Sequence, residues 1–373
     1  MPRWVVALAA VLALAVACTE GGDTRTSPSA SPTPGRWHGG TLRLAAVSDI
    51  PLIGRVDGRP DPEAGLDPQL TWGSVGWELL RCCLVRTLFA YSGQPGREED
   101  MDAFLEWLAP WYEGDWWFDT VKAFSECETG RPGLARARIE RSLEANVRNA
   151  HGAHVKAHVL YELHEDAEAM RFLDAWMPGC GKQALMHCHL SWHLAVTAFA
   201  LGQSDRAWQV YREHVHPGGA WGPPINIVSD SAAFLWRAEL AGAARKPELW
   251  RDLRDYSMAA FPKVGVFFAD VHAALALVAT GDADGLQRLV TALRERVAAG
   301  RLPPGEVVPN LVEAFGAYGA GDWNGAIRLL EKALPETVRI GGSRAQRDIV
   351  AKTLFAAYLK AGRPEDAGRM ARH

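Results

Sequence analysis

Two pairs of histidines carry the strongest chemical signal in the sequence. His154 and His158 are four residues apart, and His189 and His193 repeat this spacing 35 residues later. Because an α-helix turns once in about 3.6 residues, each pair lies along one face of a helix. Histidines spaced in this way can bind one zinc ion, with a nearby carboxylate as third ligand or general base. The alternative is that they are buried polar residues that hydrogen-bond neighbouring helices, since the spacing lacks the glutamate of the HExxH motif.

Further polar residues fall where a helical core would hold apolar ones. Glu162 follows His158 by four residues, and Asp270 and His272 lie together on a later helix. Equivalent faces of successive helices in a repeat array are about 10 Å apart or less, so side chains from two or three helices could converge. The candidate metal or acid–base site comprises His154, His158, Glu162, His189, His193, Asp230, Asp270 and His272.

Residues 216–230, HPGGAWGPPINIVSD, are rich in glycine and proline. We expect them to form a long loop that could fold over a groove. Asp230 and Ser231 would then cap the N-terminus of the following helix, which is the alternative to a catalytic role for Asp230.

The segment RIGGSRAQRDIV predicts a second, smaller site. Gly341 and Gly342 interrupt the chain, Ser343 can cap the next helix, and arginines make this helix start basic. A helix N-terminus of this kind can bind an anion, so we predict anion binding by Arg339, Ser343 and Arg347. Arg347 and Asp348 could instead form local ion pairs.

Composition excludes several classes of protein. The net charge is −4 with a pI near 6.3, so no basic excess suggests nucleic-acid binding. The six cysteines include no CxxC pair, and their scatter does not resemble a disulfide framework. GxSxG, P-loop and GxGxxG motifs are absent from the sequence, which leaves nucleophile and nucleotide chemistries without support.

The first residues predict export and a lipid anchor. Residues 1–18 contain an apolar run that ends in Leu14-Ala15-Val16-Ala17-Cys18, which resembles a bacterial lipobox with Cys18 as the lipidated residue. The alternative is an ordinary signal peptide. Residues 19–38 are rich in Ser, Thr, Pro and Gly and predict a disordered tether.

Residues 39–98 follow a different pattern. GGTLRLA, LDPQL and WELLRCCLVRTLFAY resemble the start of a family 5 ABC-transporter solute-binding protein. This truncated fragment is too short to form the cleft of a bilobed binding protein, although it leaves a peptide-transport-related lipoprotein as one alternative.

From residue 101 to residue 373 the chain reads as amphipathic helices joined by short turns. Turns recur about every 34 to 41 residues, and most contain glycine, as at Gly281, Gly321 and Gly362. Small residues follow about five positions later, as at Ala326 and Ala367. This pattern predicts an all-α fold, a TPR-like α-solenoid of about seven helix pairs. Such repeats bind proteins or peptides on the concave face, which the first helix of each pair lines.

A second resemblance covers residues 112–373. EGDWWFDTVKAFSECETGR, HGAHVKAHVLYE, MHCHLSWHLAVTAFALGQSDRAWQVY, SDSAAFLWRAELAG, FADVHAALALVATGD and RIGGSRAQRDIV occur in this order. Together they resemble the tetratricopeptide repeat protein 38 family, which implies helical repeats but no defined activity. The further repeats that precede this region in the family are replaced here by the solute-binding fragment, with Met101 at the boundary.

These patterns predict a repeat protein that binds a protein or peptide in a histidine-lined concave groove. The alternative is a metal-dependent or acid–base enzyme that uses the groove histidines, so the sequence leaves enzymatic activity open. The sequence establishes no cofactor. The groove histidines could bind a divalent metal such as zinc. We expect membrane attachment only through Cys18, at the outer face, or a cytoplasmic protein if translation starts at Met101.

Overall fold

Helices make up most of the chain that the computed structural model describes, residues 92–370. The predicted signal peptide, the tether, Cys18 and residues 39–91 of the solute-binding fragment lie outside the described residues. The α-helices are α3 (Arg97–Leu108), α4 (Trp116–Glu128), α5 (Pro132–Ala145), α6 (Ala150–Glu162), α7 (Asp166–Trp176), α8 (His187–Ala200), α9 (Ser204–Val210), α10 (Pro224–Leu240), α11 (Pro247–Ala260), α12 (Phe267–Thr280), α13 (Ala283–Ala298), α14 (Val307–Gly319), α15 (Trp323–Ala333), α16 (Arg344–Lys360) and α17 (Pro364–Met370). Short 3₁₀ segments are η1 (Ala109–Trp111), η2 (Met177–Gly179) and η4 (Leu334–Ile340), and η3 (Tyr211–Val215) is a π-helical turn.

Consecutive helices pack as neighbouring pairs. α4 packs on α5, α6 on α7, α8 on α9, α10 on α11, α12 on α13, α14 on α15, and α16 on α17. Within the described residues the fold is therefore all-α, as the sequence predicted, and no strand is found there.

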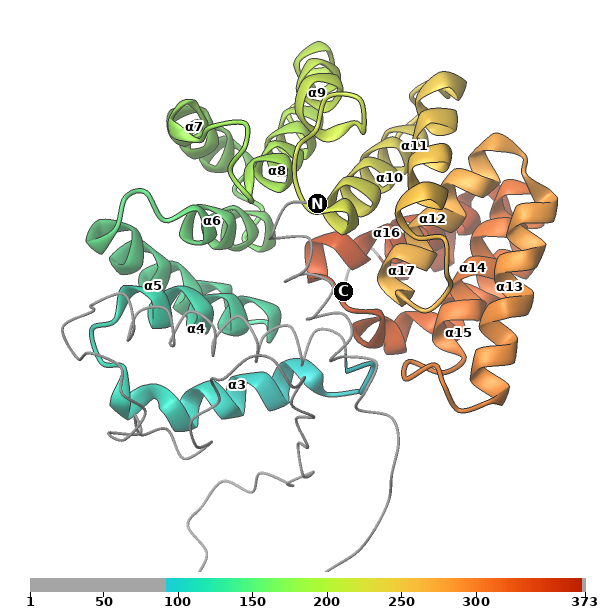
Figure 1. Ribbon diagram of the computed structural model, residues 1–373. Helices are drawn as coiled ribbons and strands as arrows, with labels where there is room; N and C mark the ends of the chain where they lie inside the picture. The colour runs from blue at the N-terminus through green and yellow to red at the C-terminus, as the bar shows by residue number, and fades with distance from the viewer. Residues whose placement is uncertain (1–91, 371–373) are drawn as a thin grey trace, which may run out of the picture. The chain divides into compact units, whose positions relative to one another are not determined.

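The first helices of the pairs also contact one another in order. α4 contacts α6, α6 contacts α8, α8 contacts α10, α10 contacts α12, and α12 contacts α14. They form one continuous layer that curves around α16, which lies between the α4–α6 side and the α10–α14 side in Figure 1 and packs against α6, α10 and α14. The helices that carry the predicted site residues are the first helices, so this layer positions the site.

Local sequence accounts for where α6 begins. The Asn149 side chain accepts a hydrogen bond from the Gly152 amide at 3.0 Å and so caps the N-terminus of α6. A Cβ on Gly152 would lie 2.9 Å from a methyl carbon of Leu143, because α5 and α6 approach closely there. Glycines end two of the first helices. Gly130 after α4 and Gly202 after α8 have φ of 78° and 74°, as predicted for helix C-termini.

The predicted loop over residues 216–230 is too long. Helix α10 begins at Pro224, so Asp230 and Ser231 lie inside the helix rather than at its N-cap. Proline is well tolerated in the first helical turn, because backbone N–H groups there have no acceptor within the helix and the loss of one breaks no helical hydrogen bond. The Pro223–Pro224 pair therefore marks the start of the helix, and both Asp230 and Ser231 are buried.

The ends of the described unit are joined by a cluster of buried charges, Arg97, Glu98, Glu128 and Arg347, which we call the closing cluster. Glu98 Oε1 lies 3.1 Å from Arg97 Nη2 and 2.8 Å from Arg347 Nη2, which is also 3.6 Å from Glu128 Oε2. Arg97 Nη2 donates to the Gly342 carbonyl at 2.9 Å. These contacts hold α3 and α4 against the start of α16.

The helical unit begins before the predicted boundary at Met101. Helix α3 starts at Arg97, and Met101 is buried in it with 3% of its surface exposed. In residues 92–370, no helix is both long and apolar enough to cross a membrane.

Candidate metal centre

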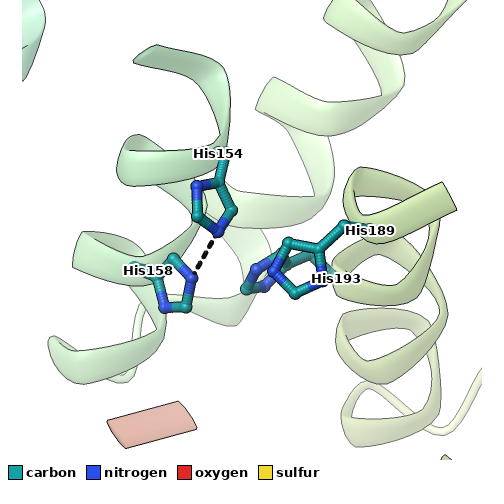
Figure 2. A group of neighbouring side chains, drawn as sticks. All are labelled: His154, His158, His189 and His193. Atoms are coloured by element: carbon teal, nitrogen blue, oxygen red, sulfur yellow. Dashed lines mark hydrogen bonds between the residues drawn. The ribbon is translucent and has the colours of Figure 1, made fainter. Parts of the chain in front are cut away.

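Four predicted histidines form one group on two adjacent helices. His154 and His158 lie on α6, and His189 and His193 lie on α8. One ligand nitrogen from each lies within 4.8 Å of those of the other three. Figure 2 shows the two pairs facing each other across the space between the helices. We call this group the histidine cluster.

The imidazoles within the histidine cluster are in contact. His158 Nε2 and His154 Nε2 are 2.7 Å apart, as the dashed line in Figure 2 marks. Ring centroids are 4.5 Å apart for His158 and His193, and 4.7 Å apart for His154 and His189. The spacing of four residues and the 35-residue repeat thus place both pairs at equivalent heights on neighbouring helices.

A buried carboxylate orients His189. Asp230 Oδ2 on α10 lies 2.7 Å from His189 Nδ1, and none of the Asp230 surface is exposed. The other oxygen, Oδ1, accepts from Gln346 Nε2 on α16 at 3.2 Å. A carboxylate on one ring nitrogen fixes the proton there and leaves Nε2 of His189 as the atom that can bind a cation.

The fourth histidine keeps an available lone-pair position. His193 Nε2 is buried and has no hydrogen-bond partner among the described residues. Burial, followed by repulsion from His158, His189 and Arg237, holds the pKa of His193 well below its ordinary value. His193 is therefore neutral near pH 7, which is the protonation state that binds metals.

The surroundings of the histidine cluster are dry and aromatic. Its four members are 5%, 0%, 4% and 3% exposed in chain order. Phe124 from α4 packs on His154 with ring centroids 6.0 Å apart, and Trp192 stacks on His189 with 5.4 Å between centroids. Low dielectric around neutral imidazoles strengthens their interaction with any cation that they bind.

The donor set fits a divalent transition metal. Imidazole nitrogens are ligands of zinc, copper, iron and nickel, and four of them match the tetrahedral shell of zinc. Zinc–nitrogen bonds of 2.0–2.1 Å would place ligand nitrogens about 3.3 Å apart in a tetrahedron. The His154–His158 nitrogens are closer than this, and the widest pair is within 4.8 Å, so side-chain adjustments of about 1 Å would complete the shell.

The remaining predicted residues of the site lie outside the histidine cluster. Glu162 forms an ion pair with Arg344 Nε at 3.0 Å. Asp270 accepts from the Gly265 amide at 2.9 Å, and burial raises the pKa of its carboxyl to about 6. His272 donates from Nδ1 to the Phe268 carbonyl at 2.7 Å, and burial lowers its pKa to about 4.

The predicted anion-binding residues have partners within the chain. Arg339 donates to the carbonyls of Gly93 and Pro303 at 2.9 and 3.0 Å. Ser343 caps α16 in a capping box with Gln346, as the sequence predicted for its hydroxyl. Arg347 belongs to the closing cluster. Anion binding at this helix start stays a prediction, and its donors are occupied in this structure.

Two residues of the surroundings were not singled out from the sequence. Gln346 supports Asp230 from a distance of 116 residues along the chain, and only its place in the capping box is visible in the sequence. Arg237, on α10, is the charged residue of the otherwise apolar stretch AAFLWRA and is 8% exposed. A charged residue buried in such a stretch is a signal for function, because desolvating it costs free energy.

In a comparison of the chain with models of known protein families, no family model matches.

Proposed function

We propose that this protein is a metal-binding helical-repeat protein and that the histidine cluster binds one divalent transition-metal ion, with zinc as the leading candidate. The observation that carries this proposal is the convergence of four buried ligand nitrogens within 4.8 Å of one another. Each neutral imidazole has one acceptor nitrogen, and a single cation can be bound by the acceptor nitrogens of all four rings at once.

The contact between His189 and Asp230 supports the same proposal. Histidines that bind metals usually give their other ring N–H to a carboxylate or carbonyl, which sets their orientation. Asp230 is fully buried and also offsets one unit of the charge that a divalent ion with neutral ligands would bring into the interior. The carboxylate is thus placed to orient one ligand and to stabilise the bound ion.

Burial favours a closed centre over a hydrolytic one. A catalytic zinc usually has three protein ligands and one open position for water or substrate, whereas structural zinc has four protein ligands. The four histidines fill that shell and are at most 5% exposed. The bound metal would join α6 to α8, the first helices of two successive pairs, and so stabilise the curvature of the array.

The scaffold of this centre is, in our proposal, a TPR-like α-solenoid. The support is that each described pair from α4–α5 to α16–α17 packs on its predecessor, as in stacked repeats. Binding of a protein or peptide in the groove remains a prediction. The inner face of α10 is covered by α16, since Trp236 Nε1 donates to Thr353 at 2.9 Å.

Metal analysis of the full chain tests the proposal. The protein is purified without chelators and its metals are measured by plasma mass spectrometry, beside cobalt titration followed by visible absorption. We expect about one divalent metal per chain, and tetrahedral cobalt with strong absorption bands. The double variant His158→Ala/His193→Ala removes one ligand from each helix and should hold less than about a tenth of the wild-type metal.

The matched control is another pair of histidines in contact. His187 Nε2 lies 3.3 Å from His214 Nδ1, outside the histidine cluster, so His187→Ala/His214→Ala should retain the metal. Equal metal content in both double variants, or no metal and no cobalt spectrum in the wild type, would contradict the proposal.

A further inference from the structure

Several buried polar atoms next to the histidine cluster have no hydrogen-bond partner within the described residues. They are Arg237 Nε and Nη1 and Trp192 Nε1. Buried polar groups in folded proteins almost always have a partner, and exceptions point to a bound water, ion or ligand. These atoms come from α8 and α10, which are neighbours in the inner layer.

Arg237, Trp192 and His193 lie next to one another in that order. The Arg237 guanidinium carbon lies 5.4 Å from the centre of the Trp192 ring. Trp192 in turn lies 4.8 Å from the His193 ring, measured between centroids. Arg237 also acts on the charge state of His193 and His272, lowering the pKa of each, although burial is the larger cause. Arg237 and Trp192 therefore contact each other beside the histidine cluster.

Chemistry decides what could satisfy them. The guanidinium N–H groups of Arg237 and the indole N–H of Trp192 can only donate, so they need an acceptor. One guanidinium nitrogen of Arg237 already has partners within the chain. Nη2 donates to the Ala345 carbonyl and lies 3.7 Å from Asp348 Oδ2. Lys352 Nζ is 3.1 Å from the same carboxylate oxygen, so Asp348 is shared between two cations.

We propose that Arg237 and Trp192 form a binding site for a small oxyanion, a carboxylate or an inorganic oxyanion such as phosphate, beside the histidine cluster. The anion accepts hydrogen bonds from the unpartnered Arg237 nitrogens and from Trp192 Nε1. Its charge adds to that of Asp348, which Arg237 shares with Lys352. Charge-assisted hydrogen bonds of this kind are about twice as strong as neutral ones.

The site does not use the four ligand histidines, so it stands independently of the proposed metal. A bound metal would increase the affinity of this site for anions. Only this increase in affinity rests on the proposed function. A divalent ion held by neutral imidazoles leaves about one positive charge uncompensated after Asp230, and a nearby anion would reduce that excess. Anions should therefore bind more tightly to the metal-loaded protein than to the metal-free protein.

The test is calorimetric titration of the full chain with acetate and with inorganic phosphate, in metal-free and zinc-loaded forms. Chloride serves as the comparison ion. Wild-type protein should bind acetate, phosphate or both with one site per chain. Removing the guanidinium in Arg237→Met should weaken binding about 10- to 100-fold, the range for hydrogen bonds to charged groups. Trp192→Phe keeps an aromatic ring, loses one neutral donor, and should weaken binding about 3- to 10-fold.

The matched control is Arg206→Met, which also removes one guanidinium but from an ion pair with Asp174 at the surface. It should bind the anions as the wild type does. Which of the two anions binds more tightly identifies the source of the ligand, a carboxylate or a phosphate. If Arg237→Met fails to fold, Trp192→Phe against the wild type decides the question.

The outcomes separate the two proposals. Anion binding to metal-free protein that takes up no zinc would contradict the metal centre and support the anion site. Zinc binding without saturable acetate or phosphate binding would overturn the anion site, and so would equal affinities of wild type, Arg237→Met and Trp192→Phe. In that event the buried donors are hydrated by internal water.

Discussion

The molecule buries two polar clusters that differ in one respect. In the closing cluster, the guanidinium groups and carboxylates are of opposite charge, and each charge has an ionic partner in the chain. In the histidine cluster, four side chains of one type face one another, and His193 Nε2 lacks a partner among the described residues. The closing cluster supplies its own opposite charges, although Glu128 Oε1 has no hydrogen-bond partner among the described residues. The histidine cluster holds four ligands of one type, and the cation that we propose would complete it. A buried group of like ligands therefore points to a bound ion more strongly than a buried group of opposite charges does.

Breaking the closing cluster should have the largest effect on stability. Arg347→Met leaves the buried carboxylates of Glu98 and Glu128 without this cation, so the free energy of unfolding should fall by about 3–5 kcal/mol. Urea unfolding followed by circular dichroism measures the change. The control is Arg254→Met, whose pair with Asp255 is at the surface and should matter by less than about 0.5 kcal/mol. A loss below about 1 kcal/mol for Arg347→Met would show that the cluster does not hold the ends together.

The pH dependence of stability should reveal His272, a buried histidine whose Nδ1 has a partner inside the chain. Burial lowers its pKa in the folded state to about 4, against about 6.5 when unfolded. Between these values the unfolded chain binds a proton that the folded chain does not, so stability falls as the pH is lowered through this range. From about pH 7.5 to about pH 4.5, His272 should cost about 2–3 kcal/mol.

Urea unfolding of wild type and His272→Asn at both pH values isolates this contribution. The variant should lose less stability than the wild type on acidification, because asparagine does not titrate. Parallel losses in the two proteins would show that His272 is not the group responsible.

Removing the contact that orients His189 should lower the affinity for metal without unfolding the protein. Asp230→Asn removes the charge that holds His189 and should reduce affinity about 10- to 100-fold. Competition with a chromophoric chelator measures it. The matched control is Asp270→Asn, a buried carboxylate that contacts the Gly265 amide instead of a histidine. Equal losses in both variants would argue against a specific role for Asp230.

Loosening the helix that supports both clusters should have the smallest effect. Ser343 caps α16, which supplies Gln346 to Asp230 and Arg347 to Glu98. Ser343→Ala should cost about 1 kcal/mol, the usual value of an N-cap. Thermal unfolding measures it beside Ser204→Ala, an exposed serine at the start of α9 where no side-chain cap is formed, which should change little. A loss no larger than that of the control would mean that the capping box is not a source of stability.

The periodic features of this fold were predictable from the sequence. The four-residue spacing placed each histidine pair on one helix face, and the repeat length placed the pairs on successive first helices, where they meet. The same reasoning grouped His272 and Asp270 with them, but α10 lies between α8 and α12 in the inner layer. Equivalence of position in a repeat implies proximity only for adjacent repeats, because each repeat contacts mainly its neighbours.

Contacts that break the periodicity were not predictable. Gln346 reaches Asp230 from 116 residues away, and Arg347 reaches Glu98 because α16 returns to the start of the described unit. No spacing in the sequence encodes such a return, since it depends on the accumulated curvature of all the intervening helices. The start of α10 was missed for a local reason: proline was counted as a helix breaker where it begins the helix.

The contact of α16 with α3, α4 and α6 bears on how the protein folds. In an open row of repeats, the end units fray first and unfolding can proceed piece by piece. Here the last helix pair is tied to the first helices through Arg347, Arg344 and Asp348. Amide hydrogen exchange should therefore be slow at both ends together, and the long-range contacts should make folding slower than in an open helical array of similar size.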